Sequence, residues 1–161
     1  MSTTETVPQT ASNPDVAAGA AQFLTPVVID LEALVVNGKQ AHWHVRGDNF
    51  IGVHELLDTV VAHAQEWADL AAERIVALGL PVDARLQTVA EKTTTKPLTA
   101  GFRQSNETIT EVIGQIDAAL KAVNIAVSEL AELDQTSQDV AIEIARGLDK
   151  DRWFLFAHIS K

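Results

Sequence analysis

Apolar residues recur at helical spacing in four long segments of the chain. Asn13, Pro14 and Asp15 form a helix start, with a capping residue, a proline at the first helical position and an acid near the positive end of the helix dipole. No stretch alternates apolar and polar residues as a half-buried strand does. The pattern predicts an all-α fold with helices at about 13–45, 51–78 and 105–133, and a fourth that follows Asp134–Ser137 and reaches the C-terminus.

The connections between these helices differ in length. Arg46–Asn49 is a short turn, so the first two helices should lie antiparallel. Residues 79–101 form a long connection rich in Gly, Thr and Pro, with one helical turn expected near Leu86–Ala90. Pro26 should kink the first helix or mark its true start. Two short turns around one long crossover are typical of a ferritin-like four-helix bundle, here with a short helix in the crossover.

Composition agrees with one folded domain, since the chain has 161 residues and 47% of them are hydrophobic. The polar residues 1–13 predict a flexible N-terminal tail, followed by the bundle domain at 14–161. The absence of cysteine excludes disulfides, Cys-ligated zinc and a Cys nucleophile. No apolar run reaches the roughly 18 residues of a membrane span and no N-terminal signal is visible. We therefore expect a cytoplasmic protein with no membrane partner.

Four polar residues of the second helix share one side, away from its apolar stripe. At 100° per residue, they fall within a sector of about 100°. Acids that face away from a core usually form a solvated surface, but the residues between these acids are mostly short or apolar. That composition favours close contact with another helix, so the sector indicates an interface between subunits. The polar residues are His54, Asp58, Asp69 and Glu73, and those between them include Ala62, Gln65, Ala72 and Val76.

The spacing along this helix decides how the residues can bind a metal. Asp58 and Asp69 are about 16 Å apart along the axis, whereas metal–ligand bonds are only about 2.0–2.6 Å. The pair of His54 and Asp58 and the pair of Asp69 and Glu73 therefore cannot share one ion within one chain. Two antiparallel copies about a two-fold axis would join one pair to the other and create two equivalent sites. His42, near the end of the first helix, could join His54 and Asp58.

The ligand types and the charge favour a cation site. Imidazoles with carboxylates and no thiolate suit Fe(II), Mn(II) or Zn(II). The formal net charge of −10 attracts cations and repels nucleic acid and anionic membranes. These residues leave two chemistries open, namely oxidation of bound iron and a metal-dependent hydrolase in which the ion activates water. The sequence specifies no substrate pocket for the hydrolase.

Three stretches carry a family resemblance: K-Q-A-H-W-H-V-R-G-D-N-F-I-G-V-H-E-L-L-D from Lys39, D-L-A-A-E-R from Asp69, and L-D-K-D-R-W-F-L-F-A-H near the C-terminus. Together they closely resemble the Dps family of mini-ferritins. The resemblance implies a ferroxidase centre with one or two iron ions between two-fold-related subunits. It also implies a hollow homo-dodecamer that oxidises Fe(II), preferably with hydrogen peroxide, stores ferric mineral and protects against oxidative damage. The implied ligands are His42, His54 and Asp58 of one subunit with Asp69 and Glu73 of its neighbour.

The resemblance assigns further roles outside the centre. Trp43 matches an aromatic residue that the family places near the centre, and packing explains it equally well. Asp134, Asp139 and Glu143, around the start of the fourth helix, resemble the acidic lining of the family's three-fold pore. A solvated acidic helix end explains these three residues equally well.

DNA binding is a point at which this chain departs from the family pattern. Some members bind DNA through tails rich in Lys and Arg. Here no Lys or Arg precedes Lys39, and no basic extension stands before the end at Lys161. Phosphate contacts dominate DNA affinity, so we expect no direct DNA compaction and set aside an architectural DNA-binding role.

Overall fold

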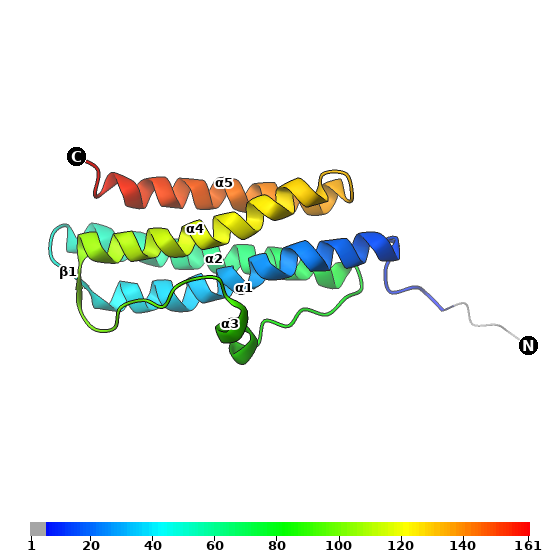
Figure 1. The fold of residues 1–161 in the computed structure, drawn as a ribbon, viewed down its shortest axis with the longest axis horizontal. Coiled ribbons are helices and arrows are strands. Elements are labelled where there is room, and N and C mark those ends of the chain that lie inside the picture. Colours follow the sequence, from blue (N-terminus) through cyan, green and yellow to red (C-terminus); the bar gives the residue numbers. More distant parts are fainter. Residues whose placement is uncertain (1–5) are drawn as a thin grey trace, which may run out of the picture.

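Residues 6–161 are described in the computed structural model, which forms a bundle of four long helices (Figure 1). The long helices run side by side, and the short helix α3 lies against α1 outside the bundle. This confirms the predicted all-α, ferritin-like bundle with a short helix in the long crossover. The helices are α1 (Pro14–His44), α2 (Phe50–Ala77), α3 (Leu86–Lys92), α4 (Ser105–Leu130) and α5 (Gln135–Ala157).

Local capping sets the helix ends. The side chain of Asn13 accepts a 2.8 Å hydrogen bond from the Asp15 amide and caps α1, as predicted. α1 continues through Pro26, so this proline is not the start of the helix. α5 begins directly after Asp134, a few residues earlier than predicted. The reason is that the Asp134 side chain accepts a 3.1 Å hydrogen bond from the Ser137 amide and caps the helix.

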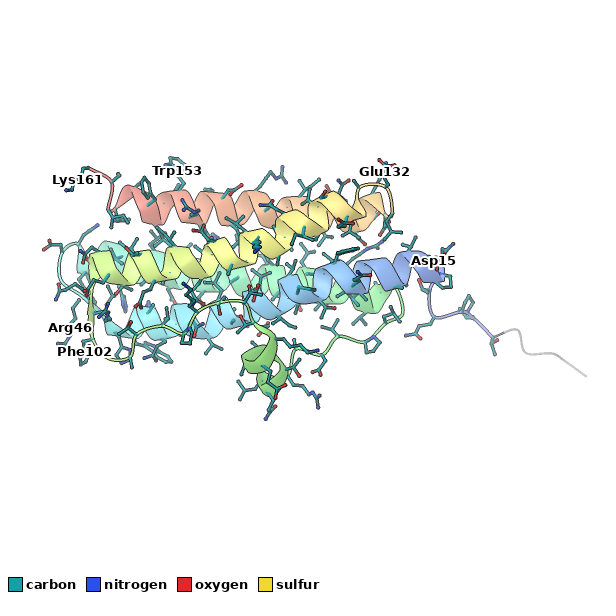
Figure 2. All side chains as sticks on the ribbon, in the orientation of Figure 1. Asp15, Arg46, Phe102, Glu132, Trp153 and Lys161 are labelled. Atoms are coloured by element: carbon teal, nitrogen blue, oxygen red, sulfur yellow. The ribbon has the colours of Figure 1, made fainter. Side chains whose placement is uncertain are left out.

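A pair of two-residue strands ties the α1–α2 turn to the start of α4. β1 (Val45–Arg46) pairs in parallel with β2 (Arg103–Gln104). The sequence predicted no strand here, because two residues are too few to show an alternating pattern. The Arg46 guanidinium lies 3.2 Å from the centre of the Phe102 ring, and Figure 2 shows both side chains at this end of the bundle. These contacts hold the turn between α1 and α2 in place.

The bundle core takes up the apolar side of every long helix. Leu31, Leu57, Ile116 and Leu148, one from each long helix, are fully buried. Within residues 6–161, α1 is the one helix long and apolar enough to cross a membrane by length and composition, although 56% of its most apolar window is buried in the bundle. Asp30 interrupts the apolar run of α1, which is why no uninterrupted span was visible in the sequence. The core accounts for the hydropathy of this helix.

Two buried polar side chains fix the long crossover onto the bundle. The carboxylate of Asp30 accepts hydrogen bonds from the Thr93 hydroxyl at 2.8 Å and from the amide and hydroxyl of Thr94 at 2.8 and 2.6 Å. Gln115 donates to the carbonyl oxygen of Lys96, and its own amide oxygen accepts from Asn37 at 2.8 Å. The Thr-rich stretch that reads as a linker in the sequence is therefore an anchored segment, since a buried carboxylate needs such partners.

The predicted tail is only partly described. Its residues 1–5 lie outside the described residues, and residues 6–13 form no helix before Pro14. Thr10 is half-buried and lies close to Gly79, at the end of α2. The division into a flexible tail at 1–13 and a domain at 14–161 stays a prediction.

Candidate metal centre

His42 and His54 face each other across the turn between α1 and α2. Their rings stack with centroids 3.7 Å apart and an interplanar angle of 21°. Nδ1 of His42 bonds the backbone oxygen of His54 at 2.7 Å, and Nδ1 of His54 bonds the backbone oxygen of His42 at 2.8 Å. The turn thus brings together two histidines that are twelve positions apart and links them reciprocally.

This reciprocal bonding fixes the chemistry that each ring offers. A carbonyl oxygen only accepts hydrogen bonds, so both Nδ1 atoms must carry the proton. In the neutral ring, Nε2 then keeps its lone pair free for a metal ion. Bonds of this kind to the second ring nitrogen orient histidine ligands in metal sites. The geometry therefore presents His42 and His54 as two ready nitrogen ligands.

Asp58 lies one helical turn beyond His54 on α2, and Lys39 of α1 reaches it. The Lys39 ammonium forms an ion pair with the Asp58 carboxylate, whose side chain is 51% exposed. The hydrogen bond from Lys39 lowers the pKa of Asp58 most, and the positive charge of Lys39 lowers it further. Asp58 is therefore held as a carboxylate, the form that binds metal, while a cationic side chain occupies one of its oxygens.

The contact of Lys39 with the candidate ligand Asp58 is one that the sequence analysis did not find. Lys39 precedes His42 by three positions on α1, so helical spacing places the two side chains next to each other. That spacing was the available signal. Its contact with Asp58, however, crosses from one helix to another, which a single-helix pattern does not show.

Asp69 and Glu73 lie farther along α2 and are exposed. No group of three or more His, Asp or Glu side chains within residues 6–161 is close enough to hold a metal ion in one chain. A single chain therefore pairs His42 with His54 and places Asp58 one helical turn away, without gathering three ligands around one ion. Asp69 and Glu73 lie apart from this pair. The shared five-ligand site stays a prediction.

The other predicted site residues have different surroundings. Trp43 is 61% exposed, and so is available to a partner surface. Asp139 and Glu143 are exposed on α5, and their role in a pore stays a prediction.

Asp134 forms a 2.8 Å ion pair with Arg74 in addition to capping α5. Burial raises the pKa of Asp134, but the hydrogen bonds from Ser137 and Arg74 outweigh burial and hold the pKa below its ordinary value.

Comparison with known proteins places this geometry in a family. The Ferritin-like domain model matches residues 30–161. The "DNA protection during starvation protein" of Agrobacterium fabrum is 36% identical over 135 residues, which cover 83% of this chain and 82% of that protein. The chain belongs to the Dps family of ferritin-like proteins.

Solved structures of Dps proteins have the same fold. Dps from Microbacterium arborescens, solved in the high iron form, is 64% identical with a TM-score of 0.91, and the match covers 94% of this chain and 99% of that one. Dps from Mycobacterium smegmatis is 28% identical with a TM-score of 0.88, and the match covers 99% and 96% of the two chains. The bundle and its crossover are thus those of the Dps family.

Proposed function

We propose that this chain is the subunit of a ferroxidase and iron-storage shell. Fe(II) would bind, one or two ions per site, where two chains meet about a two-fold axis. The reciprocally bonded pair of His42 and His54, with both Nε2 atoms free and Asp58 one turn away, is the observation that carries the proposal. Asp69 and Glu73 of the neighbouring chain would complete the ligand set. The relative from Microbacterium arborescens, solved in a high iron form, supports iron as the metal.

The donor set suits oxidation of its own metal substrate. Imidazole and carboxylate ligands bind Fe(II) and leave positions open to an oxidant. Two Fe(II) ions each lose one electron, and hydrogen peroxide takes both electrons with two protons to give two molecules of water as its O–O bond breaks. The reaction removes Fe(II) and peroxide, which together would generate hydroxyl radicals. Lys39 and iron would compete for Asp58, because both are cations and Lys39 already holds one of the two carboxylate oxygens.

The assembly and its surroundings are part of the proposal. We propose a hollow homo-dodecamer that stores the ferric product as mineral, works in the cytoplasm and has no membrane partner. A net charge of −10 on each chain opposes binding to DNA phosphates. We therefore propose iron and hydrogen peroxide, rather than DNA, as what this protein binds.

Anaerobic loading of Fe(II) followed by hydrogen peroxide tests the function. We expect rapid Fe(III) formation, followed by absorbance, with about two Fe(II) oxidised per peroxide, because each peroxide accepts two electrons. Air in place of peroxide should give slower oxidation at the same iron load. An oxidation rate equal to that of Fe(II) in buffer without protein would contradict the proposal.

A second experiment tests how iron enters. If the exposed acids near the start of α5 meet around a three-fold pore, they attract Fe(II) through their charge. Asp139→Asn should then slow mineral growth several-fold. The amount of Fe(III) formed from the first few Fe(II) ions added per chain should stay unchanged. Glu129→Gln, which removes an exposed acid near the end of α4, is the matched control. Equal uptake rates in the Asp139 variant, the control and the unchanged protein would assign Asp139 to a solvated surface.

A further inference from the structure

A second histidine of α2 has a partner that the proposed centre does not use. His63 lies between α2 and α5, where its Nδ1 is 2.9 and 3.1 Å from the two carboxylate oxygens of Asp151. Asp151 belongs to α5 and is only 2% exposed. The His63 side chain is 39% exposed. A buried carboxylate therefore holds Nδ1 of an imidazole that is itself partly open to solvent.

This arrangement sets the tautomer of His63. A carboxylate accepts hydrogen bonds, so Nδ1 of His63 carries the proton and Nε2 of the neutral ring keeps its lone pair. The carboxylate also makes the imidazole a stronger base, as it does for histidines that bind metals. The Trp67 ring, with its centroid 5.3 Å from that of His63, limits the movement of the imidazole. Nε2 of His63 is thus a positioned nitrogen ligand.

Glu66 supplies a second ligand next to His63. It follows His63 by three positions on α2, and residues at this spacing have Cβ atoms roughly 5–6 Å apart on the same face of a helix. Glu66 is exposed and forms no salt bridge with any of residues 6–161. Its carboxylate is therefore free to meet an ion bound at Nε2 of His63.

We propose that His63 and Glu66 bind a divalent transition-metal ion, with Asp151 as the residue that positions His63. One imidazole, one carboxylate and water molecules suit Fe(II), Zn(II) or Co(II). Neither ligand is one of the five residues of the shared centre. On the wheel of α2, Glu66 lies about 20° beyond Glu73, and His63 lies about 180° from His54. The site needs one chain only, so it does not depend on the proposed function.

The competing explanation is that His63 only satisfies the buried carboxylate of Asp151. Burial raises the pKa of Asp151, and the hydrogen bond from His63 opposes that rise, so the pair has a structural role in either case. The two explanations differ in what they require. A structural role needs only the donor at Nδ1, whereas a metal site also needs Nε2 and the carboxylate of Glu66.

Calorimetric titration with Zn(II) separates the two explanations. The background protein used carries His54→Ala and Asp58→Ala, because these substitutions remove half of the shared centre. His63→Asn keeps a donor at the position of Nδ1 and removes Nε2. Glu66→Gln keeps the size of the side chain and removes its charge. Glu55→Gln, at another exposed acid of α2, is the matched control. Circular dichroism confirms the fold of each variant.

We expect the background protein and the Glu55 control to bind about one Zn(II) per chain at this site. His63→Asn should weaken that binding at least about 100-fold, since removal of a ligand costs more than the 10–100-fold lost with an orienting residue. Glu66→Gln should weaken it at least about tenfold, and Asp151→Asn about 10–100-fold. Unchanged Zn(II) affinity and stoichiometry in either the His63 or the Glu66 variant, or no Zn(II) binding by the background protein, would overturn the proposal.

Discussion

Replacing both His54 and Asp58 by Ala should slow Fe(II) oxidation at least about 100-fold. Losing a residue that only orients a metal ligand costs about 10–100-fold, and this variant loses two ligands outright. It also removes the ring that stacks on His42, whereas the bond from His42 Nδ1 to the backbone oxygen of residue 54 remains. Stopped-flow absorbance after anaerobic loading measures the rate.

The variant must still assemble for this result to be informative. Asp58 is largely exposed and His54 is half-buried, so their loss removes little of the bundle core. His44→Ala is the matched control, because His44 lies two positions from His42 and bonds only the backbone oxygen of Gln40. Size-exclusion chromatography should show the same assembly for all three proteins. Oxidation at the unchanged rate in the double variant would show that His54 and Asp58 are not ligands of the centre.

Replacing Gly147 by Val should lower the free energy of unfolding by about 2–3 kcal/mol. A Cβ atom at Gly147 would lie 2.0 Å from Trp67 Cζ2 and less than 3.0 Å from two further atoms of the ring. The ring is buried in the core and has little room to move, and overpacking of this kind typically costs about 1–3 kcal/mol. For a chain of this length we expect the Tm to fall by roughly 4–12 °C.

Gly114→Ala is the matched control for that substitution. Gly114 also lies inside a long helix, but there a Cβ atom would have no atom of residues 6–161 within 4 Å beyond its own stretch of helix. Ala should raise stability there by up to about 1 kcal/mol, because Gly is a poor helix former. Both variants should be melted at one protein concentration, since assembly makes the Tm concentration-dependent. Equal Tm values for Gly147→Val and the unchanged protein would show that packing of the Trp67 ring does not require glycine at position 147.

The sequence predicted those features that depend on local patterns. Helical spacing gave the four long helices, and the capping group at Asn13 gave the start of α1. The wheel and the rise of α2 predicted that His54 and Asp58 do not share an ion with Asp69 and Glu73 of the same chain, and the ligand set shared between chains stays a prediction. Local rules succeed here because they describe residues within a few turns of one another.

The contacts that the sequence did not predict join distant parts of the chain. Lys39 meets Asp58 across two helices, and His63 meets Asp151 at a separation of 88 positions. Asp134 was a pore candidate because the family resemblance implies an acidic pore lining. Its observed contacts, a helix cap and an ion pair with Arg74, were not predicted, and its role in a pore stays a prediction. Such pairings depend on which helix faces lie together, and no periodicity within one helix specifies that.

Mixing two inactive variants is the most direct test of a centre shared between chains. One variant lacks His54 and Asp58, the other lacks Asp69 and Glu73, and each should be inactive alone. A two-fold interface between them contains one complete site and one site that keeps only His42. Random co-refolding at equal amounts makes half of all pairs mixed, so roughly a quarter of the activity of the unchanged protein should return. No recovery in assemblies shown to be mixed by mass spectrometry, or full activity in either variant alone, would contradict a shared centre.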